Sequence, residues 1–270
     1  MNRDYLIELL NQEDFEFDKK VIDRFEIYCD FLLEYNQKVN LTAIKDPDEV
    51  IVKPFIDSVM VLKHSEISVN SKIADVGTGP GFPAIPMLIM RNDLDFSLIE
   101  ATKKKLVFIE QLLEKLNFSA NLLHLRGEEA GKMPQYREKF DFVTARAVAN
   151  LRELSEYCLP LVKIGGKMIS MKGNLSEEEL EMSNKAIKLL GGKIENKVQY
   201  SLPNSDNRTI ITIEKKKIPR THIPEHLLLS QRNRLYRRIY GKNNFRYKPK
   251  RWCRQDDHSR KSFRLSGYFR

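Results

Sequence analysis

Apolar residues in the first sixty positions recur every three or four residues, the spacing that places them on one face of an amphipathic helix. One such stripe consists of Val21, Phe25, Tyr28, Leu32 and Tyr35. A second helical pattern covers residues 53–64. The chain is therefore predicted to begin with a helical segment, residues 1–65, that packs on the part that follows.

From residue 72 onward the pattern changes to short apolar runs that alternate with helical stretches. The expected strands are 72–76, 96–100, 121–126, 140–145, 166–172, 193–202 and 208–215. The expected helices between them are 83–90, 103–116, 150–162 and 176–190. Alternation of this kind is typical of an α/β protein.

The end of the pattern refines the expected sheet. Ser176 and Glu179 have the spacing of a capping box that starts the last helix, and Gly191 and Gly192 end it. The last two strands are joined only by the turn-rich segment PNSDN, so they should pair antiparallel. We therefore predict an open, mostly parallel sheet with one reversed strand and with helices on both faces.

The net charge of +9 is unevenly distributed along the 270 residues. Residues 219–270 contain 15 lysines and arginines and 3 aspartates and glutamates, whereas the 218 residues before them contain 31 and 34. The alternating pattern ends at about the same point. We expect the ligand-binding domain over residues 66–218 and a basic tail over residues 219–270.

Composition argues against a membrane protein, a disulfide framework and a metal site. The longest apolar stretches, such as residues 82–90, are shorter than the roughly 20 residues that span a bilayer, and the N-terminus is too acidic for a signal peptide. Cys29, Cys158 and Cys253 are odd in number and form no C-x-x-C pair. A monomeric protein of the reducing cytoplasm is the expectation.

Three glycines, Gly77, Gly79 and Gly81, follow the first predicted strand and precede a helix. In an open α/β sheet, ligands bind beyond the carboxyl ends of the strands, which is where this loop lies. Its spacing is G-x-G-x-G, one residue shorter than the G-x-G-x-x-G loop that cradles a dinucleotide pyrophosphate. The loop favours a ligand with an adenosine and no phosphates. The alternative is an ordinary strand–helix turn. Asp75 is expected to order the loop and to touch a ligand only indirectly.

Candidate polar residues follow the other strands. Glu100 ends the second strand, where a carboxylate can accept hydrogen bonds from both hydroxyls of a ribose; alternatively it is a charge at the start of the next helix. The segment RGEEAG, residues 126–131, follows the third strand and could face an adenine, or be a solvated acidic loop. Arg146 leaves the fourth strand on the rim of the same pocket, where a lone arginine could also form a surface salt bridge.

Several motifs occur in the order seen in one protein family. They are LEYNQKVNLTAI (33–44), FIDSV (55–59), DVGTGPGFPAIP (75–86), RGEEA (126–130), TARAVANL (144–151), LPLVKIGG (159–166), MKG (171–173) and YSLPN with Arg208. The chain resembles the bacterial 16S rRNA guanine-N7 methyltransferases, the RsmG family, also called glucose-inhibited division protein B. The resemblance covers about residues 20–214, and its most specific parts are the glycine loop with its trailing Phe-Pro and the ARAVA run.

The resemblance implies a Rossmann-like methyltransferase fold, S-adenosylmethionine as the methyl donor, and a guanine in the 530 loop of 16S rRNA, free or in the small ribosomal subunit, as the acceptor. The cofactor-binding residues that it implies are Gly77, Phe82, Gly127, Glu128 and Arg146, and Glu100 keeps the acidic role common to methyltransferases at the end of the second strand. Thr78, Gly79 and Gly81 are expected to bind the cofactor as members of the glycine loop. It also implies that Arg146 is the catalytic residue that positions substrate or cofactor, and that Lys163, Lys172 and Arg208 meet RNA phosphates. The absence of an evident general base agrees with this chemistry, because guanine N7 carries a lone pair and loses no proton.

The tail departs from the family pattern after about residue 220, and two interpretations remain. It is an added RNA-binding arm, in which aromatic residues stack on bases and arginines grip phosphates, or it comes from a shifted reading frame and is poorly ordered. The second is favoured, because the charge reversal coincides with the loss of the pattern. Two other functions remain open for the whole chain: an NAD-dependent oxidoreductase, and a non-enzymatic RNA-binding protein acting through the tail.

Overall fold

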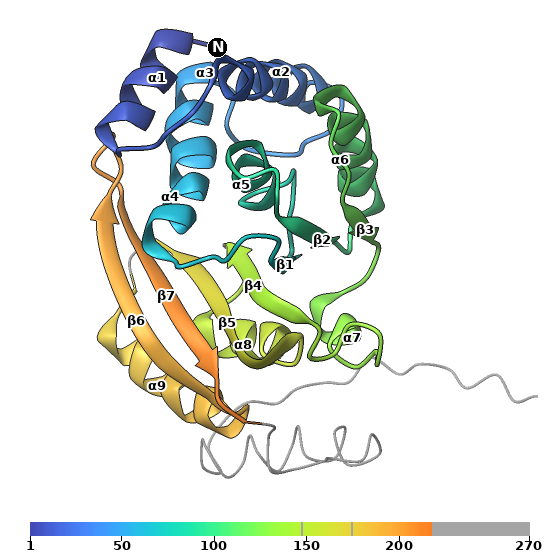
Figure 1. The fold of residues 1–270 in the computed structure, drawn as a ribbon, viewed down its shortest axis with the longest axis vertical. Helices are drawn as coiled ribbons and strands as arrows, with labels where there is room; N and C mark the ends of the chain where they lie inside the picture. The colour runs from blue at the N-terminus through green and yellow to red at the C-terminus, as the bar shows by residue number, and fades with distance from the viewer. Residues whose placement is uncertain (147, 174, 218–270) are drawn as a thin grey trace, which may run out of the picture. The chain divides into compact units, whose positions relative to one another are not determined.

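A seven-stranded sheet forms the centre of the computed structural model, which describes residues 1–146, 148–173 and 175–217 (Figure 1). The strands are β1 (Lys72–Val76), β2 (Asp95–Ile99), β3 (Asn121–Leu123), β4 (Phe140–Arg146), β5 (Val162–Lys172), β6 (Gly192–Ser201) and β7 (Asn207–Lys215), in the order β3-β2-β1-β4-β5-β7-β6. Among the described strands, β7 alone runs opposite to the other six, and it pairs antiparallel with both β5 and β6. The predicted parallel sheet with one reversed strand is confirmed. The predicted tail, 219–270, lies outside the described residues.

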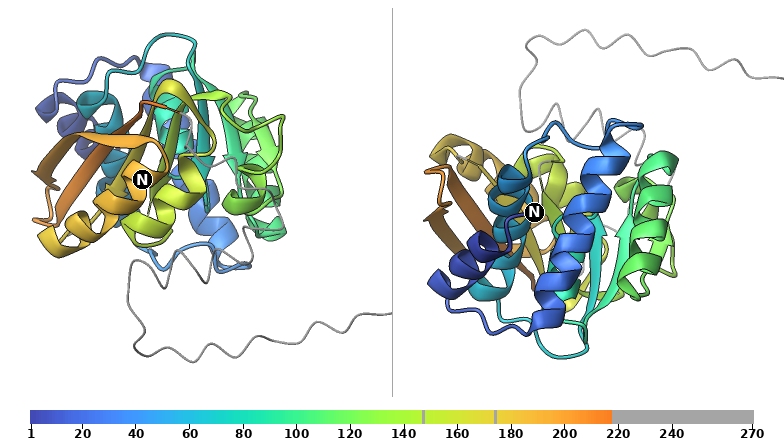
Figure 2. Two further views of the ribbon diagram at one scale, coloured as in Figure 1. Left: turned by 90° about the horizontal axis from the view of Figure 1, so that it is seen from below. Right: turned by 90° about the horizontal axis from the view of Figure 1, so that it is seen from above.

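Helices cover both faces of this sheet (Figure 2). The helices are α1 (Arg3–Gln12), α2 (Lys19–Asn36), α3 (Pro47–Val50), the π-helical η1 (Ile51–Ile56), α4 (Asp57–His64), α5 (Ala84–Met90), α6 (Lys103–Leu116), α7 (Gly127–Ala130), α8 (Leu151–Cys158) and α9 (Glu177–Leu189). Alternate strand residues point to opposite faces, so that Ile73 packs with α1 to α6 whereas Ala74 packs with α7 to α9. The helices of the first sixty residues therefore share one hydrophobic core with the sheet.

Two expected elements differ from the structure at proline positions. The helix expected over residues 53–64 begins as the wider π-helix η1, which contains Pro54; proline has no N–H to donate to a regular α-helical ladder. The helix expected over residues 150–162 ends at Cys158, two residues before Pro160, which has no N–H to continue the helical ladder.

The predicted capping box at the start of α9 is only half formed. The Ser176 hydroxyl accepts a hydrogen bond from the Glu179 N–H at 3.1 Å, as expected. The Glu179 carboxylate, however, accepts from the N–H of Leu151 at 2.8 Å and pairs with Lys172 at 3.1 Å. The side chain therefore connects α9 to the start of α8 and the end of β5, because a tertiary partner outcompetes the local one.

Helix α2 reaches the glycine loop that follows β1. The Tyr28 hydroxyl donates to the carbonyl of Pro80 at 2.7 Å. The Tyr28 ring stacks on Phe82, with 5.3 Å between the ring centroids. The N-terminal helical segment thus holds the loop from the side opposite the strands.

Asp75 lies beneath the same loop, near the end of β1, with no exposed surface. Its Oδ1 accepts a hydrogen bond from the Thr144 hydroxyl at 2.8 Å, which joins β1 to β4. Burial raises the pKa of Asp75 from 3.8 to about 7, because a carboxylate without solvent is costly. The hydrogen bond from Thr144 joins two strands beneath the loop, so the ordering of the loop by Asp75 remains a prediction.

Replacing Asp75 with asparagine should make the stability of the protein less dependent on pH. The unfolded chain releases the Asp75 proton near pH 3.8 and the folded chain near pH 7, so this group destabilises the fold progressively between those values as pH rises. We expect the free energy of unfolding of Asp75→Asn, relative to the wild type, to increase by roughly 2–3 kcal/mol between pH 5 and pH 8. Urea unfolding at both pH values measures it; a difference that stays constant with pH would contradict the raised pKa.

Candidate nucleoside-binding site

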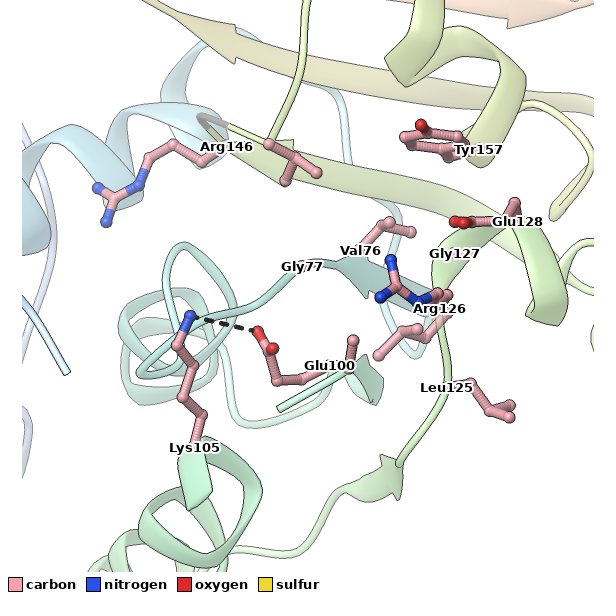
Figure 3. A pocket seen from close by; sticks show the side chains of 13 residues that line it. Val76, Gly77, Glu100, Lys105, Leu125, Arg126, Gly127, Glu128, Arg146 and Tyr157 are labelled. Atoms are coloured by element: carbon pink, nitrogen blue, oxygen red, sulfur yellow. Dashed lines mark ion pairs between the residues drawn. The ribbon is translucent and has the colours of Figure 1, made fainter. Parts of the chain in front are cut away.

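A cavity of about 400 Å³ opens at the carboxyl ends of the strands, beside the glycine loop (Figure 3). Its lining residues are Val76, Gly77, Ile99, Glu100, Ala101, Lys105, Leu125, Arg126, Gly127, Glu128, Arg146, Val148 and Tyr157. They come from the ends of β1 to β4 and the segments that follow. This is the position at which open α/β sheets bind ligands.

The glycine loop brings bare backbone to the wall of this cavity. The Gly77 N–H donates to the Ile99 carbonyl at 2.8 Å, which ties the loop to the end of β2. Gly77, Gly79 and Gly81 all have positive φ, at 70°, 62° and 109°, a region that other residues rarely adopt. A Cβ on Gly77 would also lie 2.7 Å from a methyl of Val148. Only glycine fits this turn.

Glu100 closes the loop from the β2 side. One carboxylate oxygen accepts from the Gly79 N–H at 3.0 Å, and the other accepts from the Thr102 N–H at 2.8 Å. The Lys105 ammonium lies 3.9 Å away across the cavity (Figure 3). The side chain is 6% exposed, so its orientation is fixed. Each carboxylate oxygen has a second lone pair for a ligand donor.

The far wall is formed by α7 and α8. Gly127 and Glu128 begin α7 and line the cavity with Tyr157 of α8. A Cβ on Gly127 would lie 2.7 Å from Val76 and 3.3 Å from Tyr157. A side chain there would wedge the wall apart, so the glycine allows close packing of α7 on β1.

Arg146 lines the cavity from the end of β4, but its guanidinium extends toward α4. Nη1 lies 3.3 Å from the Lys53 carbonyl and 3.4 Å from Oδ2 of Asp57. The guanidinium also lies over the Phe82 ring, 4.9 Å from its centroid, a cation–π geometry. The prediction that Arg146 lies at the rim of the cavity agrees with this position.

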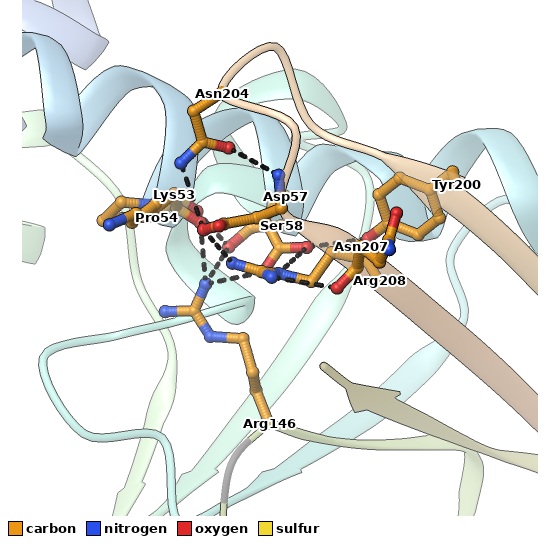
Figure 4. Close-up of polar contacts among 10 residues, drawn as sticks. Lys53, Pro54, Asp57, Ser58, Arg146, Tyr200, Asn204, Asn207 and Arg208 are labelled. Carbon is orange, nitrogen blue, oxygen red and sulfur yellow. Dashed lines mark hydrogen bonds and ion pairs between the residues drawn. The ribbon is translucent and has the colours of Figure 1, made fainter. Parts of the chain in front are cut away.

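Sequence reasoning assigned no role to Asp57, yet this residue gathers the polar side chains beside Arg146 (Figure 4). Its Oδ1 accepts from the Tyr200 hydroxyl at 2.7 Å and lies 3.6 Å from Nε of Arg208. Burial and the neighbouring Asp57 charge raise the pKa of Tyr200, so the phenol keeps its proton and remains a donor. We call Asp57, Arg146, Tyr200 and Arg208 the Asp57 cluster. The one signal in the sequence was a carboxylate inside an otherwise apolar run, FIDSVMVL.

The structure brings together only part of the predicted site. Gly77, Glu100, Gly127, Glu128 and Arg146 line the cavity. The other members of the loop do not: Thr78 is 1% exposed, and the side chain of Phe82 packs between Tyr28 and Arg146. For these residues, backbone or indirect roles remain predictions.

The three predicted RNA-binding cations do not form one surface. Lys163 pairs with Asp141 at the amino ends of β5 and β4, the end of the sheet opposite the cavity. Lys172 lies at the carboxyl end of β5 but donates to the Ala149 carbonyl at 2.8 Å and pairs with Glu179. Arg208 belongs to the Asp57 cluster. Of the three, only Lys172 and Arg208 lie where they could contact the same RNA beside the cavity.

The part of the chain that the structure describes contains neither a candidate metal site nor a candidate membrane-spanning helix. Among residues 1–146, 148–173 and 175–217, no group of three His, Cys, Asp or Glu side chains could hold a metal ion. No helix in the same ranges combines the length and hydropathy of a membrane span.

Comparisons with known proteins agree with the motifs. A family model described as rRNA small subunit methyltransferase G matches residues 21–210. The chain is 45% identical over 204 residues to the ribosomal RNA small subunit methyltransferase G of Clostridium novyi (strain NT), covering 75% of this chain and 84% of that relative. It is 45% identical over 224 residues to the protein of that name from Acetivibrio thermocellus, covering 82% and 92%.

The solved structures include more distant methyltransferases. A precorrin-6y C5,15-methyltransferase from Geobacter metallireducens GS-15 aligns with 59% of this chain and 87% of its own, at 16% identity and a TM-score of 0.46. The family model, in contrast, matches residues 21–210, and both relatives are 45% identical over most of the chain. The prediction from the motifs is confirmed: the chain belongs to the rRNA small subunit methyltransferase G family.

Proposed function

We propose that this protein transfers the methyl group of S-adenosylmethionine to N7 of a guanine in the 530 loop of 16S rRNA. Family membership supports the methylation of small-subunit rRNA. The cavity supports the donor, and the observation that carries it is the contact between Glu100 and the glycine loop. The position of the guanine and the choice of N7 rest on the family resemblance.

The Glu100 contact favours a nucleoside without phosphates. In a dinucleotide site the backbone N–H groups of the glycine loop face a pyrophosphate. Here the Gly79 N–H donates to the Glu100 carboxylate, which places a negative charge where phosphates would otherwise lie. The remaining lone pairs of the same carboxylate suit the two hydroxyls of a ribose. This arrangement speaks against an NAD-dependent oxidoreductase.

The other lining residues fit the rest of the donor. Gly77 admits the sugar close to the backbone, since a side chain there would fill the cavity wall. Gly127, Glu128 and Tyr157 line the part of the cavity beyond β3, which we call the adenosine slot and which suits the adenine. The amino-acid end then extends in the other direction, toward β4 and Arg146.

The reaction requires the protein to align guanine N7 with the methyl group of the donor, and it requires no proton transfer before attack. When bound, S-adenosylmethionine supplies a methyl group activated by a positively charged sulfur. Guanine N7 has an in-plane lone pair, so no residue must remove a proton before attack. Holding acceptor and donor in line can account for several kcal/mol of the barrier. Because N7 lies in the deep major groove of A-form RNA, an unpaired guanine in a loop is the accessible target.

Methyl transfer can be tested directly. The protein is incubated with methyl-labelled S-adenosylmethionine and 16S rRNA or small ribosomal subunits, and N7-methylguanine is located by chemical cleavage. We expect one labelled guanine in the 530 loop, and loss of the label with Arg146→Ala while circular dichroism stays unchanged. Label elsewhere, or none with either substrate, would contradict the proposed acceptor.

A valine at Gly79 should weaken binding of S-adenosylhomocysteine, because the Gly79 N–H orients the Glu100 carboxylate that lines the cavity. Gly165 offers a matched control, because it also has positive φ, at 81° against 62°, and open space around a Cβ, but lies at the amino end of β5, away from the cavity. Both valines should lower stability by about 1–2 kcal/mol or more through backbone strain. Calorimetry should show weaker binding only for Gly79→Val; equal affinities for the two variants would contradict the site.

A chain that ends at residue 217 should still bind S-adenosylhomocysteine, because the residues of the described part of the chain already line the cavity. We expect its dissociation constant to stay within about threefold of the full chain, roughly 0.7 kcal/mol. Methyl transfer to RNA measures separately whether the tail adds affinity for the substrate. A protein acting only as an RNA-binding arm would instead lose all function on truncation.

A further inference from the structure

Asp57 is a buried carboxylate that the proposed chemistry does not yet use. It is the first residue of α4 and is 4% exposed. Its partners come from two other parts of the chain, the end of β4 and the hairpin of β6 and β7 (Figure 4). Removing a carboxylate from water is costly unless other groups compensate the charge.

Two guanidinium groups share this one carboxylate. Nη1 of Arg146 lies 3.4 Å from Oδ2, and Nε of Arg208 lies 3.6 Å from Oδ1. Tyr200 donates to Oδ1 at 2.7 Å and fixes the orientation of the group. Arg208 also reaches Asp206 at 3.3 Å, but that carboxylate is 42% exposed and screened by solvent. Asp57 is thus the buried anion that holds both arginines in place.

The Asp57 cluster lies on the side of the cavity from which an acceptor would approach. The adenosine slot lies at the carboxyl ends of β2 and β3, whereas Arg146 lies at the carboxyl end of β4 and Arg208 at the amino end of the antiparallel β7, on the other side of β1. A donor whose sugar is held at Glu100 would have Arg146, and through it the cluster, on the other side of its cavity. Of the charged side chains around it, Lys53 also belongs to this region and pairs with Glu49.

Charge moves toward the cluster during the proposed reaction. The bond between sulfur and the methyl carbon breaks as the bond from N7 to that carbon forms, and no proton moves. The sulfur becomes a neutral thioether, and the guanine ring becomes a cation. Two uncompensated guanidinium groups beside the ring would oppose this change, whereas a fixed carboxylate between them reduces the opposition.

We propose that Asp57 is a positioning residue for methyl transfer: it holds the guanidinium groups of Arg146 and Arg208 together and compensates their charge on the acceptor side of the cavity. The assignment rests on the proposed function and deepens it. It predicts that removing the Asp57 charge slows the transfer step and leaves donor binding nearly intact, because the adenosine slot is formed by other elements.

The test is Asp57→Asn, which keeps the size of the side chain and an oxygen to accept from Tyr200. The matched control is Glu138→Gln. Glu138 pairs at 2.9 Å with Lys215, which is fully buried, and precedes β4 at the opposite end of the sheet. Each change neutralises a carboxylate that pairs with a poorly exposed cation: Arg146 and Arg208 for Asp57, and Lys215 for Glu138. Any general loss of stability should therefore appear in both variants.

We expect kcat for methylation of small ribosomal subunits to fall at least about tenfold in Asp57→Asn and to change less than about threefold in Glu138→Gln. The dissociation constant for S-adenosylhomocysteine should stay within about threefold of wild type in both. Asp57→Asn should cost less in an Arg208→Ala background than in the wild type, because coupled residues are not additive.

Each contrary result has one meaning. An unchanged kcat in Asp57→Asn, additive effects with Arg208→Ala, or an equal loss in Glu138→Gln overturns the positioning role while the proposed function stands. A large loss of S-adenosylhomocysteine binding in Asp57→Asn also overturns it, since the residue would then support the donor cavity. A wild-type protein that methylates neither rRNA nor subunits overturns the proposed function, and the assignment of Asp57 with it.

Discussion

The hydrogen bond from the Gly79 N–H to the Glu100 carboxylate is the interaction on which the site depends. It joins the loop after β1 to the residue after β2, so two neighbouring strand ends become one wall. The carboxylate stabilises a loop whose glycines have lost the freedom they would have in an unfolded chain. It also sets the chemistry of the cavity, because a fixed negative charge accepts hydroxyl donors and repels phosphates. This one hydrogen bond thus bears on both the conformation of the glycine loop and the class of ligand that we propose for the cavity.

The N-terminal helices also hold the glycine loop in place. Tyr28 of α2 donates to the Pro80 carbonyl and stacks on Phe82, and the Arg146 guanidinium also lies over the Phe82 ring. The three side chains form a continuous stack from α2 to the end of β4. The glycine loop is therefore held between a carboxylate on one side and an aromatic ring on the other, which explains why Phe82 matters without lining the cavity.

Charge is distributed unequally around the cavity. The adenosine side carries Glu100 and Glu128, with Lys105 3.9 Å from the Glu100 carboxylate. The β4 side carries the Asp57 cluster, in which one carboxylate serves two guanidinium groups. Such an arrangement suits a reaction in which positive charge leaves one ligand and arrives at another. Lys163, by contrast, pairs with Asp141 at the far end of the sheet, where it cannot contribute to this field at short range.

The sequence by itself determined the elements, because periodicity of 2 and of 3.6 residues reports which face of each element is buried. It also determined the glycine loop and Glu100, because these act through backbone geometry and a position at a strand end. Tertiary structure alone decided partners far apart in the chain. Glu179 caps Leu151 instead of its own helix, and Asp57 meets Arg146, Tyr200 and Arg208. Periodicity describes one element at a time, whereas these contacts depend on which elements become neighbours.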